Sequence, residues 1–293
     1  MAIWGCNLAE VRAFVEQSNI LKTRISEDEA FRKEVLEHGR IYNEIKKYFC
    51  SFTSFLRYGS EISGGSFYRV RKAKDGRPYG SRKELVYPDP SLEHKDRMNN
   101  TSFRVLYTSF HEFTAMAETR IGEEFIGQKF QLTRFTANRP LKVYRLGFFS
   151  ELYSNSPRDS DYVKGKMREL FGADGFDRTI KGYSALECAM SDILYDQDDG
   201  YHILSSILAD AIFSTNEDID AIAYPSMQNR YGVNFAFKKE SADLLQVSYS
   251  CLNKLTGVHN NGFFEYLTEM ECFEFNNSDS FSFESTEGRV VCR

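Results

Sequence analysis

Three residues between positions 97 and 118 have side chains suited to binding an anion and acting on a nearby carbon. Arg97, Tyr107 and Glu118 lie ten and eleven positions apart within DRMNNTSFRVLYTSFHEFTAMAE. A guanidinium binds phosphate oxygens through two parallel hydrogen bonds, which lysine cannot reproduce. A tyrosine face attracts a flat cation, and a carboxylate stabilises positive charge developing on carbon. Taken singly, these residues would most often be a surface arginine, a core tyrosine and a surface carboxylate.

A strand and a helix are expected to hold two of these residues. The alternation in SFRVLYTSF predicts a strand that carries Tyr107. HEFTAMAETRIGEEF predicts a helix, with Glu118 near its middle, beside an apolar face and partly desolvated. Arg97 follows residues 74–96, whose three prolines and many charges predict a long loop.

A second stretch, DAIAYPSMQNRYGVNFAFK at 220–238, predicts a short buried strand, a proline turn and another strand. Ser226 follows the proline at the strand end, and Asn234 lies on the next strand. Both side chains can hydrogen-bond an amide or a ribose hydroxyl. Arg69 lies on a further predicted strand, SFYRVRKA. Alone, each would usually be a turn or strand residue.

Together these stretches resemble the RES domain, a branch of the ADP-ribosyltransferase-like, NAD-consuming proteins best known as bacterial toxins paired with helix-turn-helix antitoxins. The resemblance covers about residues 66–240. The matching segments are Arg69, Arg97-Met98-Asn99, Leu106-Tyr107, Thr114-Ala115-Met116-Ala117-Glu118, Asp220-Ala221-Ile222-Ala223-Tyr224-Pro225-Ser226 and Asn234. The departures are Lys95-Asp96 in place of two glycines, Met98 in place of an aromatic residue and Ala221 in place of a glycine.

The resemblance implies an α+β fold whose ADP-ribosyltransferase-like core is a split β-sheet, two small packed sheets around a cleft, with flanking helices. A helical N-terminal extension over residues 1–62 would precede a domain over 63–293. NAD would be the substrate, cleaved at its nicotinamide–ribose bond, with water, phosphate or a protein as acceptor; no cofactor and no metal are implied. The implied catalytic residues are Arg97, Tyr107 and Glu118. The implied NAD-binding residues are Arg69, Asn99, Ser226 and Asn234.

Bulk properties limit the alternatives. The 293 residues carry 37 Lys and Arg against 42 Asp and Glu, a net charge of −5, which disfavours a broad nucleic-acid surface. A local basic groove remains an alternative, lined by Arg134, Arg139, Lys142 and Arg145. The N-terminus does not resemble a signal peptide, and no stretch approaches about 18 apolar residues, so a cytoplasmic protein without a membrane segment is expected. The six cysteines form no CxxC pair, which is typical of reduced thiols.

Residues 7–58 predict helices. Asn7 is the expected N-cap of the first, and Ser26, with Glu29 three residues later, is the expected N-cap of another. Residues 160–172 predict a further helix. These N-terminal helices suggest a second hypothesis, a catalytically silent interaction module that binds a partner through them. An antitoxin or regulatory protein and a homo-oligomer are the partner classes that stay open.

Overall fold

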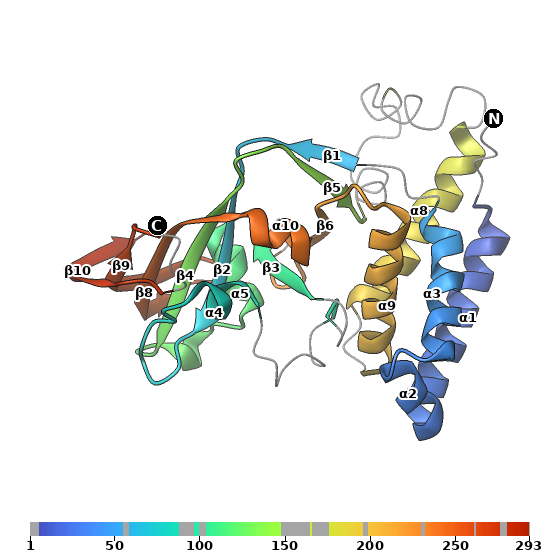
Figure 1. The fold of residues 1–293 in the computed structure, drawn as a ribbon, viewed down its shortest axis with the longest axis horizontal. Helices are drawn as coiled ribbons and strands as arrows, with labels where there is room; N and C mark the ends of the chain where they lie inside the picture. The colour runs from blue at the N-terminus through green and yellow to red at the C-terminus, as the bar shows by residue number, and fades with distance from the viewer. Residues whose placement is uncertain are drawn as a thin grey trace. The chain divides into compact units, whose positions relative to one another are not determined.

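The structure, a computed structural model, describes residues 6–54, 59–87, 97–99, 104–147, 165, 176–195, 199–229, 232–260, 262–275 and 280–292. The chain divides into two compact units (Figure 1). The helical unit comprises Met1–Ser60, Glu93–Phe103 and Tyr144–Ile222, and the sheet unit comprises Glu61–Leu92, Arg104–Val143 and Ala223–Arg293. This division differs from the expected boundary after residue 62, because the N-terminal helices share a unit with helices from the middle of the chain.

The helical unit contains five helices within the described residues: α1 (Leu8–Glu27), α2 (Glu29–Leu36), α3 (Arg40–Thr53), α8 (Phe176–Tyr195) and α9 (Asp199–Thr215). The helical character expected for residues 7–58 is confirmed for α1, α2 and α3, between residues 8 and 53, and residues 55–58 lie outside the described part of the chain. α3 packs against α9, and α1 packs against α8 and α9. Within the described residues, no helix has both the length and the apolar character needed to cross a membrane.

One of the two predicted helix caps is confirmed. The Asn7 side chain accepts hydrogen bonds from first-turn amides, and Glu10 completes a capping box. The predicted cap at Ser26 is wrong, because α1 continues through Ser26 to Glu27. Asp28 caps α2 instead, accepting a hydrogen bond from the amide of Phe31 at 3.0 Å.

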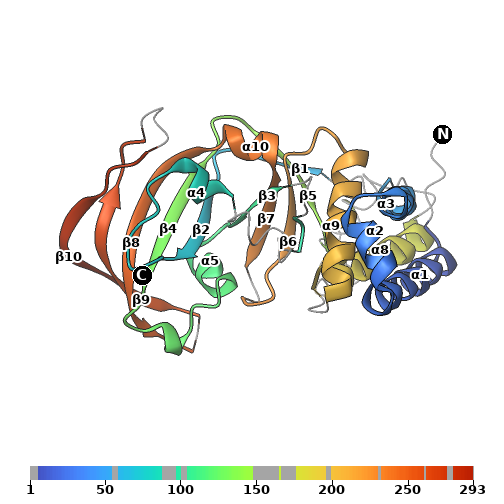
Figure 2. The same cartoon turned by 60° about the horizontal axis from the view of Figure 1, so that its bottom comes forward.

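The ten described strands lie wholly or partly in the sheet unit, and they confirm the α+β class. The sheet order is β1-β5-β6-β7-β3-β2-β4-β8-β9-β10 (Figure 2). One sheet therefore replaces the two separate small sheets that were expected. The strands are β1 (Gly59–Ile62), β2 (Ser66–Lys72), β3 (Val105–Ser109), β4 (Lys129–Thr136), β5 (Leu141–Arg145), β6 (Ala221–Pro225), β7 (Val233–Lys238), β8 (Gln246–Val258), β9 (Phe264–Cys272) and β10 (Glu284–Cys292).

The sheet is weakly joined between β2 and β3. These two strands share a single antiparallel residue pair, Tyr68 with Ser109. In contrast, β2 pairs with β4, and β3 with β7, along their whole lengths. Beside this joint, Nη1 of Arg69 donates a hydrogen bond to the backbone oxygen of Tyr107 at 3.3 Å. A side chain thus links β2 and β3 where backbone pairing is scarce.

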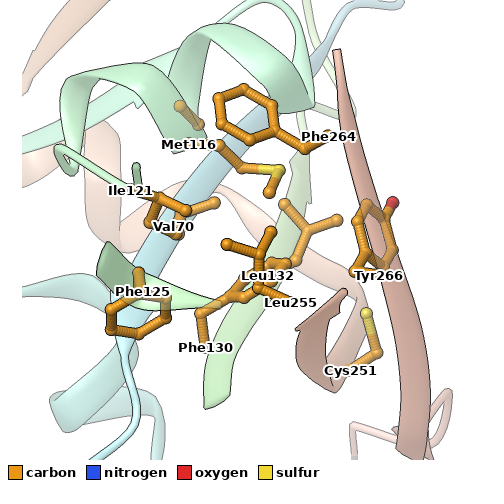
Figure 3. Packing of buried hydrophobic residues seen from close by; sticks show 11 residues of the cluster. Val70, Met116, Ile121, Phe125, Phe130, Leu132, Cys251, Leu255, Phe264 and Tyr266 are labelled. Carbon is orange, nitrogen blue, oxygen red and sulfur yellow. The ribbon is translucent and has the colours of Figure 1, made fainter. Parts of the chain in front are cut away.

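Helix α5 (Glu112–Glu118) covers one face of the sheet over β2, β3 and β7. Its Met116 is fully buried in an apolar cluster with Val70 of β2, Leu132 of β4 and Leu255 of β8 (Figure 3). Burial of such a side chain contributes about 1.5–3 kcal/mol. The cluster therefore fixes α5 on the sheet.

The opposite face carries an aromatic cluster. The Phe67 ring meets the rings of Phe235 and Phe237 edge-on, at centroid distances of 5.1 and 4.9 Å. All three side chains are buried. The middle of the sheet is thus packed on both faces, which holds β2, β3 and β7 in place.

Two other predictions concern connecting segments. Residues 74–96 were expected to be a loop, yet they contain the short helix α4 (Arg82–Val86), which begins with a capping box of Ser81 and Glu84. Arg82 anchors it to the carbonyls that end α10 (Lys239–Leu244). Residues 88–96 lie outside the described part of the chain. The helix expected over 160–172 also lies outside it, apart from residue 165.

Candidate active site

Glu118 lies at the C-terminal end of α5 and not near the middle of a helix. The chain turns directly afterwards, because Arg120 adopts a left-handed conformation with φ of 52°, and a short 3₁₀ turn follows at η2 (Glu123–Phe125). The buried neighbours are Met116 and Ile121, whereas Glu118 is exposed. The expected partial desolvation of Glu118 is therefore wrong, because the apolar face turns away from it.

One oxygen of the Glu118 carboxylate is held by two donors. Oε1 accepts hydrogen bonds from the Ser226 hydroxyl at 2.5 Å and from Nδ2 of Asn234 at 2.8 Å. Oε2 accepts none from the described residues. Hydrogen bonds to an ionised group are stronger than neutral ones. The carboxylate is thus fixed at one oxygen, while the other can interact with a ligand.

The Ser226 hydroxyl is oriented by its own loop, which follows β6. Its oxygen accepts hydrogen bonds from the backbone amides of Gln228 and Asn229, at 3.2 and 3.0 Å. A hydroxyl has two acceptor lone pairs and one proton. Because both lone pairs are occupied, the proton points to Glu118.

The Asn234 amide is oriented by a serine on the neighbouring strand. A carboxylate only accepts, so the NH₂ end of Asn234 must face Glu118. The carbonyl end, Oδ1, then accepts a hydrogen bond from the Ser109 hydroxyl at 2.7 Å. Ser109 and Asn234 are direct partners in the β3–β7 register, and each is 2 % exposed. Ser109 therefore determines which end of the amide reaches Glu118.

A glycine lets the loop after β6 approach α5. Gly232 accepts a hydrogen bond from the amide of Ser226 at 2.8 Å, which closes the loop. A Cβ atom on Gly232 would lie 2.4 Å from Cγ2 of Thr114 and 3.1 Å from Cβ of Ser226. Asn229 adds a hydrogen bond from Nδ2 to Oγ1 of Thr114 at 3.0 Å. Thr114 lies one helical turn before Glu118, so α5 contacts the loop at both positions.

Tyr107 and Arg69 lie on different faces of the sheet. Side chains alternate along a strand, so Tyr107 shares a face with Ser109. Residues paired across strands also share a face, which adds Tyr68 of β2 and Asn234 of β7. Arg69 follows Tyr68 and therefore projects from the opposite face, although its guanidinium reaches the Tyr107 carbonyl.

Arg97 and Asn99 belong to the helical unit, whereas the other five predicted site residues belong to the sheet unit. Nη1 of Arg97 donates a hydrogen bond to the carbonyl of Leu194 at 2.8 Å, and the Ser205 hydroxyl donates to the carbonyl of Arg97. Asn99 is buried. Met98 is buried too, which suits a position where an aromatic residue was expected.

The structure thus brings Glu118, Ser226 and Asn234 into one hydrogen-bonded cluster. Four cluster members had no site role assigned from the sequence, although Thr114 lies in a matching motif segment, and they are Ser109, Thr114, Asn229 and Gly232. A usable signal existed for Thr114 alone, because residues four apart share a helix face. The other three depend on strand register or on loop closure.

Arg134 of the basic groove is engaged in contacts of its own. For the basic groove, Arg134 donates a hydrogen bond to Ser248 at 2.9 Å and its guanidinium lies 5.8 Å from the centre of the Tyr249 ring. Within the described ranges, no three His, Cys, Asp or Glu side chains converge as metal ligands would.

The chain matches the model of a known protein family. The family model described as RES domain matches residues 66–250. This range contains all seven predicted site residues and the four added to the cluster. No curated protein matches the chain.

Proposed function

The chain belongs to the RES domain family, and on that premise we propose that it cleaves the nicotinamide–ribose bond of NAD. The products would be nicotinamide and an ADP-ribose unit passed to an acceptor. Water, inorganic phosphate and a protein side chain are the three acceptor classes. Such an activity suits a toxin or a defence effector that depletes NAD or modifies a protein.

The observation that supports this proposal most strongly is the anchored carboxylate of Glu118. Departure of nicotinamide leaves positive charge on the ribose ring, at the former glycosidic carbon and the ring oxygen. A negative oxygen already held in place stabilises this charge without reorganising during the reaction. Ser226 and Asn234 hold Oε1. We assign Oε2 to the ribose, either facing the developing cation or bonding a ribose hydroxyl.

The other residues have separate roles in this proposal. Tyr107 stacks on the cationic nicotinamide ring. Arg97 binds the pyrophosphate with its two-pronged guanidinium, and Asn99 contributes to NAD binding; these two roles rest on the sequence motif. Arg69 acts through its hydrogen bond to the Tyr107 carbonyl, which positions the strand that carries Tyr107.

Incubation of the purified protein with NAD tests the proposal. We expect free nicotinamide, measured by chromatography, in the presence of phosphate or of a protein acceptor. The mass of the second product identifies the acceptor, because ADP-ribose, a phosphorylated ADP-ribose and a modified protein differ in mass. A folded protein that releases no nicotinamide with any acceptor would refute NAD cleavage.

Activity in cells separates the enzyme from a silent interaction module. If the protein acts as an enzyme, the Glu118→Ala variant should lose the biological effect of the wild type. A module acting through its N-terminal helices should keep that effect and lose it when residues 1–60 are deleted.

A further inference from the structure

The exposed side of α1 carries apolar and charged side chains that line a groove beside α8. The helix faces its own unit through Val11, Phe14 and Leu21, which are buried. On its outer side, Leu8 and Ile20 are 49 % and 52 % exposed. α1 lies at the outer edge of the helices of its unit in both views (Figures 1 and 2). Burial of an exposed apolar side chain such as Ile20 against a partner favours association.

A row of residues spaced four apart lines the groove. When the row is placed antiparallel to an identical row, each positive side chain faces a negative one. From the N-terminal end the row carries positive, negative, apolar, positive and negative side chains, and all five line the groove. Residues spaced four apart form a ridge on a helix surface. The row, called here the α1 ridge, consists of Arg12, Glu16, Ile20 and Arg24 of α1 and of Asp28, the residue that directly follows the helix.

We propose that the α1 ridge binds the α1 ridge of a second copy of this chain, antiparallel, with Ile20 on the two-fold axis. Two-fold pairing centred on Ile20 opposes Glu16 with the partner copy's Arg24, and Arg12 with the partner copy's Asp28. Each contact then occurs twice, as a two-fold interface requires. Ile20 meets its own equivalent at the centre, where apolar contact is needed. This inference is independent of the proposed enzymatic function.

The same charges disfavour the competing arrangements. Parallel pairing would oppose each charge with itself. If the two antiparallel helices slide by one helical turn, like charges meet. Arg12 then faces Arg24 of the other copy for a shift in one direction, and Glu16 faces Asp28 of the other copy for a shift in the opposite direction. Like charges in contact destabilise association. The ridge thus specifies one orientation and one register.

The existing contacts of the ridge leave these charges able to pair. Arg24 forms an ion pair with Oδ2 of Asp28 at 3.8 Å, with both side chains about half exposed, and it stacks on Phe31. Oδ1 of Asp28 caps α2, so Oδ2 is the oxygen that exchanges partners. Exposed pairs of this kind contribute about 0–1 kcal/mol, so exchange for partners across the interface costs little. Arg12 and Glu16 form no ion pair with the described residues. Because one helix pair buries less than the roughly 1,200 Å² of a stable interface, a weak, concentration-dependent dimer is expected.

Analytical ultracentrifugation of the full chain over a wide concentration range tests the pairing. We expect a monomer–dimer equilibrium that high salt weakens. Glu16→Arg and Arg24→Glu should each raise the dimer dissociation constant about tenfold or more, because each places like charges together twice per dimer. Glu44→Arg is the matched control, since Glu44 is an exposed carboxylate four residues after an arginine on α3. It should leave the constant unchanged.

Mixing the two single variants is the decisive step. In a mixed dimer the introduced arginine faces the introduced glutamate, and the native Arg24 of one copy faces the native Glu16 of the other. The mixture should therefore associate with a dissociation constant close to that of the wild type, although each variant alone associates much more weakly. The double variant with both substitutions should also dimerise. A wild-type chain that stays monomeric, a dimer insensitive to Glu16→Arg, or a mixture that fails to associate would each overturn the proposal.

Discussion

Asn234→Ala offers a sharp test of how the candidate site is held together. The substitution removes the Nδ2 donor at 2.8 Å from Glu118 and the Oδ1 acceptor at 2.7 Å from Ser109. A hydrogen bond to a charged group contributes about 1.5–3 kcal/mol, and a buried hydroxyl left unpaired costs about 1–3 kcal/mol. Because Glu118 is exposed and regains part of its loss from water, we expect an unfolding free energy lower by about 2–4 kcal/mol.

The same substitution should affect catalysis more than binding. With one of its two donors gone, Glu118 is less well positioned, and a fall in kcat of about tenfold to hundredfold is expected with KM changed much less. The assays are urea denaturation and steady-state nicotinamide release. Asn253→Ala is the matched control, because Asn253 is also buried, accepts a hydrogen bond from Thr268 at 2.8 Å and forms none with Glu118 in the described part of the chain. It should lose similar stability and keep its kcat.

A double-mutant cycle identifies the role of Ser109. If Ser109 acts only by orienting Asn234, then Ser109→Ala should lower kcat in the wild type and have no effect on kcat in the Asn234→Ala background. The stability effects should be coupled by about 1 kcal/mol or more. Additive effects on kcat would refute the orientation of Asn234 by Ser109, and an unchanged kcat in Asn234→Ala would refute the role of Asn234 itself.

Three further predictions concern other parts of the molecule. Gly232→Ala should reduce kcat at least about tenfold and lower the free energy of unfolding by about 1–3 kcal/mol, since the added methyl group would overlap α5. Steady-state kinetics and urea denaturation measure these two quantities, and wild-type values for both would refute the close approach. Arg97→Lys should weaken NAD binding measured by calorimetry, because lysine cannot bind the pyrophosphate with two parallel hydrogen bonds; wild-type affinity would remove Arg97 from that role. Iodoacetamide at pH 7.5 should label the exposed Cys188 long before Cys251, because burial raises the pKa of the Cys251 thiol to about 11. Mass spectrometry of the digested protein measures the order of labelling, and early modification of Cys251 would contradict its burial.

Local patterns in the sequence were sufficient for much of the fold. The alternation of residues 102–110 predicts β3, and the Tyr-Pro turn after residue 223 predicts the end of β6. The capping box at Asn7 is also local. α4 was missed because three prolines and many charges outweighed its own capping box. The packing of α1 and α3 against α8 and α9 could not be predicted, since it depends on contacts between residues more than a hundred positions apart.

The candidate site divides in a similar way. Glu118, Ser226 and Asn234 were named from motif spacing, and the structure joins them directly. The role of Ser109 was hidden, because it depends on the register between β3 and β7. The role of Gly232 was also hidden, since a side chain at this position is excluded only by the close approach of the loop to α5. The exposure of Glu118 was misjudged because α5 ends at Glu118, and the next residues, Thr119 and Arg120, are neither glycine nor proline.

Glu118→Gln tests NAD cleavage most directly, since it removes the negative charge while keeping the side-chain size and an oxygen that can accept from Ser226 and Asn234. Single-turnover nicotinamide release and calorimetric NAD binding should be measured for the wild type and for the Glu118→Gln variant. The predicted result is a cleavage step slower by about 100-fold or more, the effect of one lost electrostatic stabiliser, with NAD affinity changed much less. A variant that binds NAD poorly but cleaves it at the wild-type rate when saturated would contradict the assigned role and make Glu118 a binding residue.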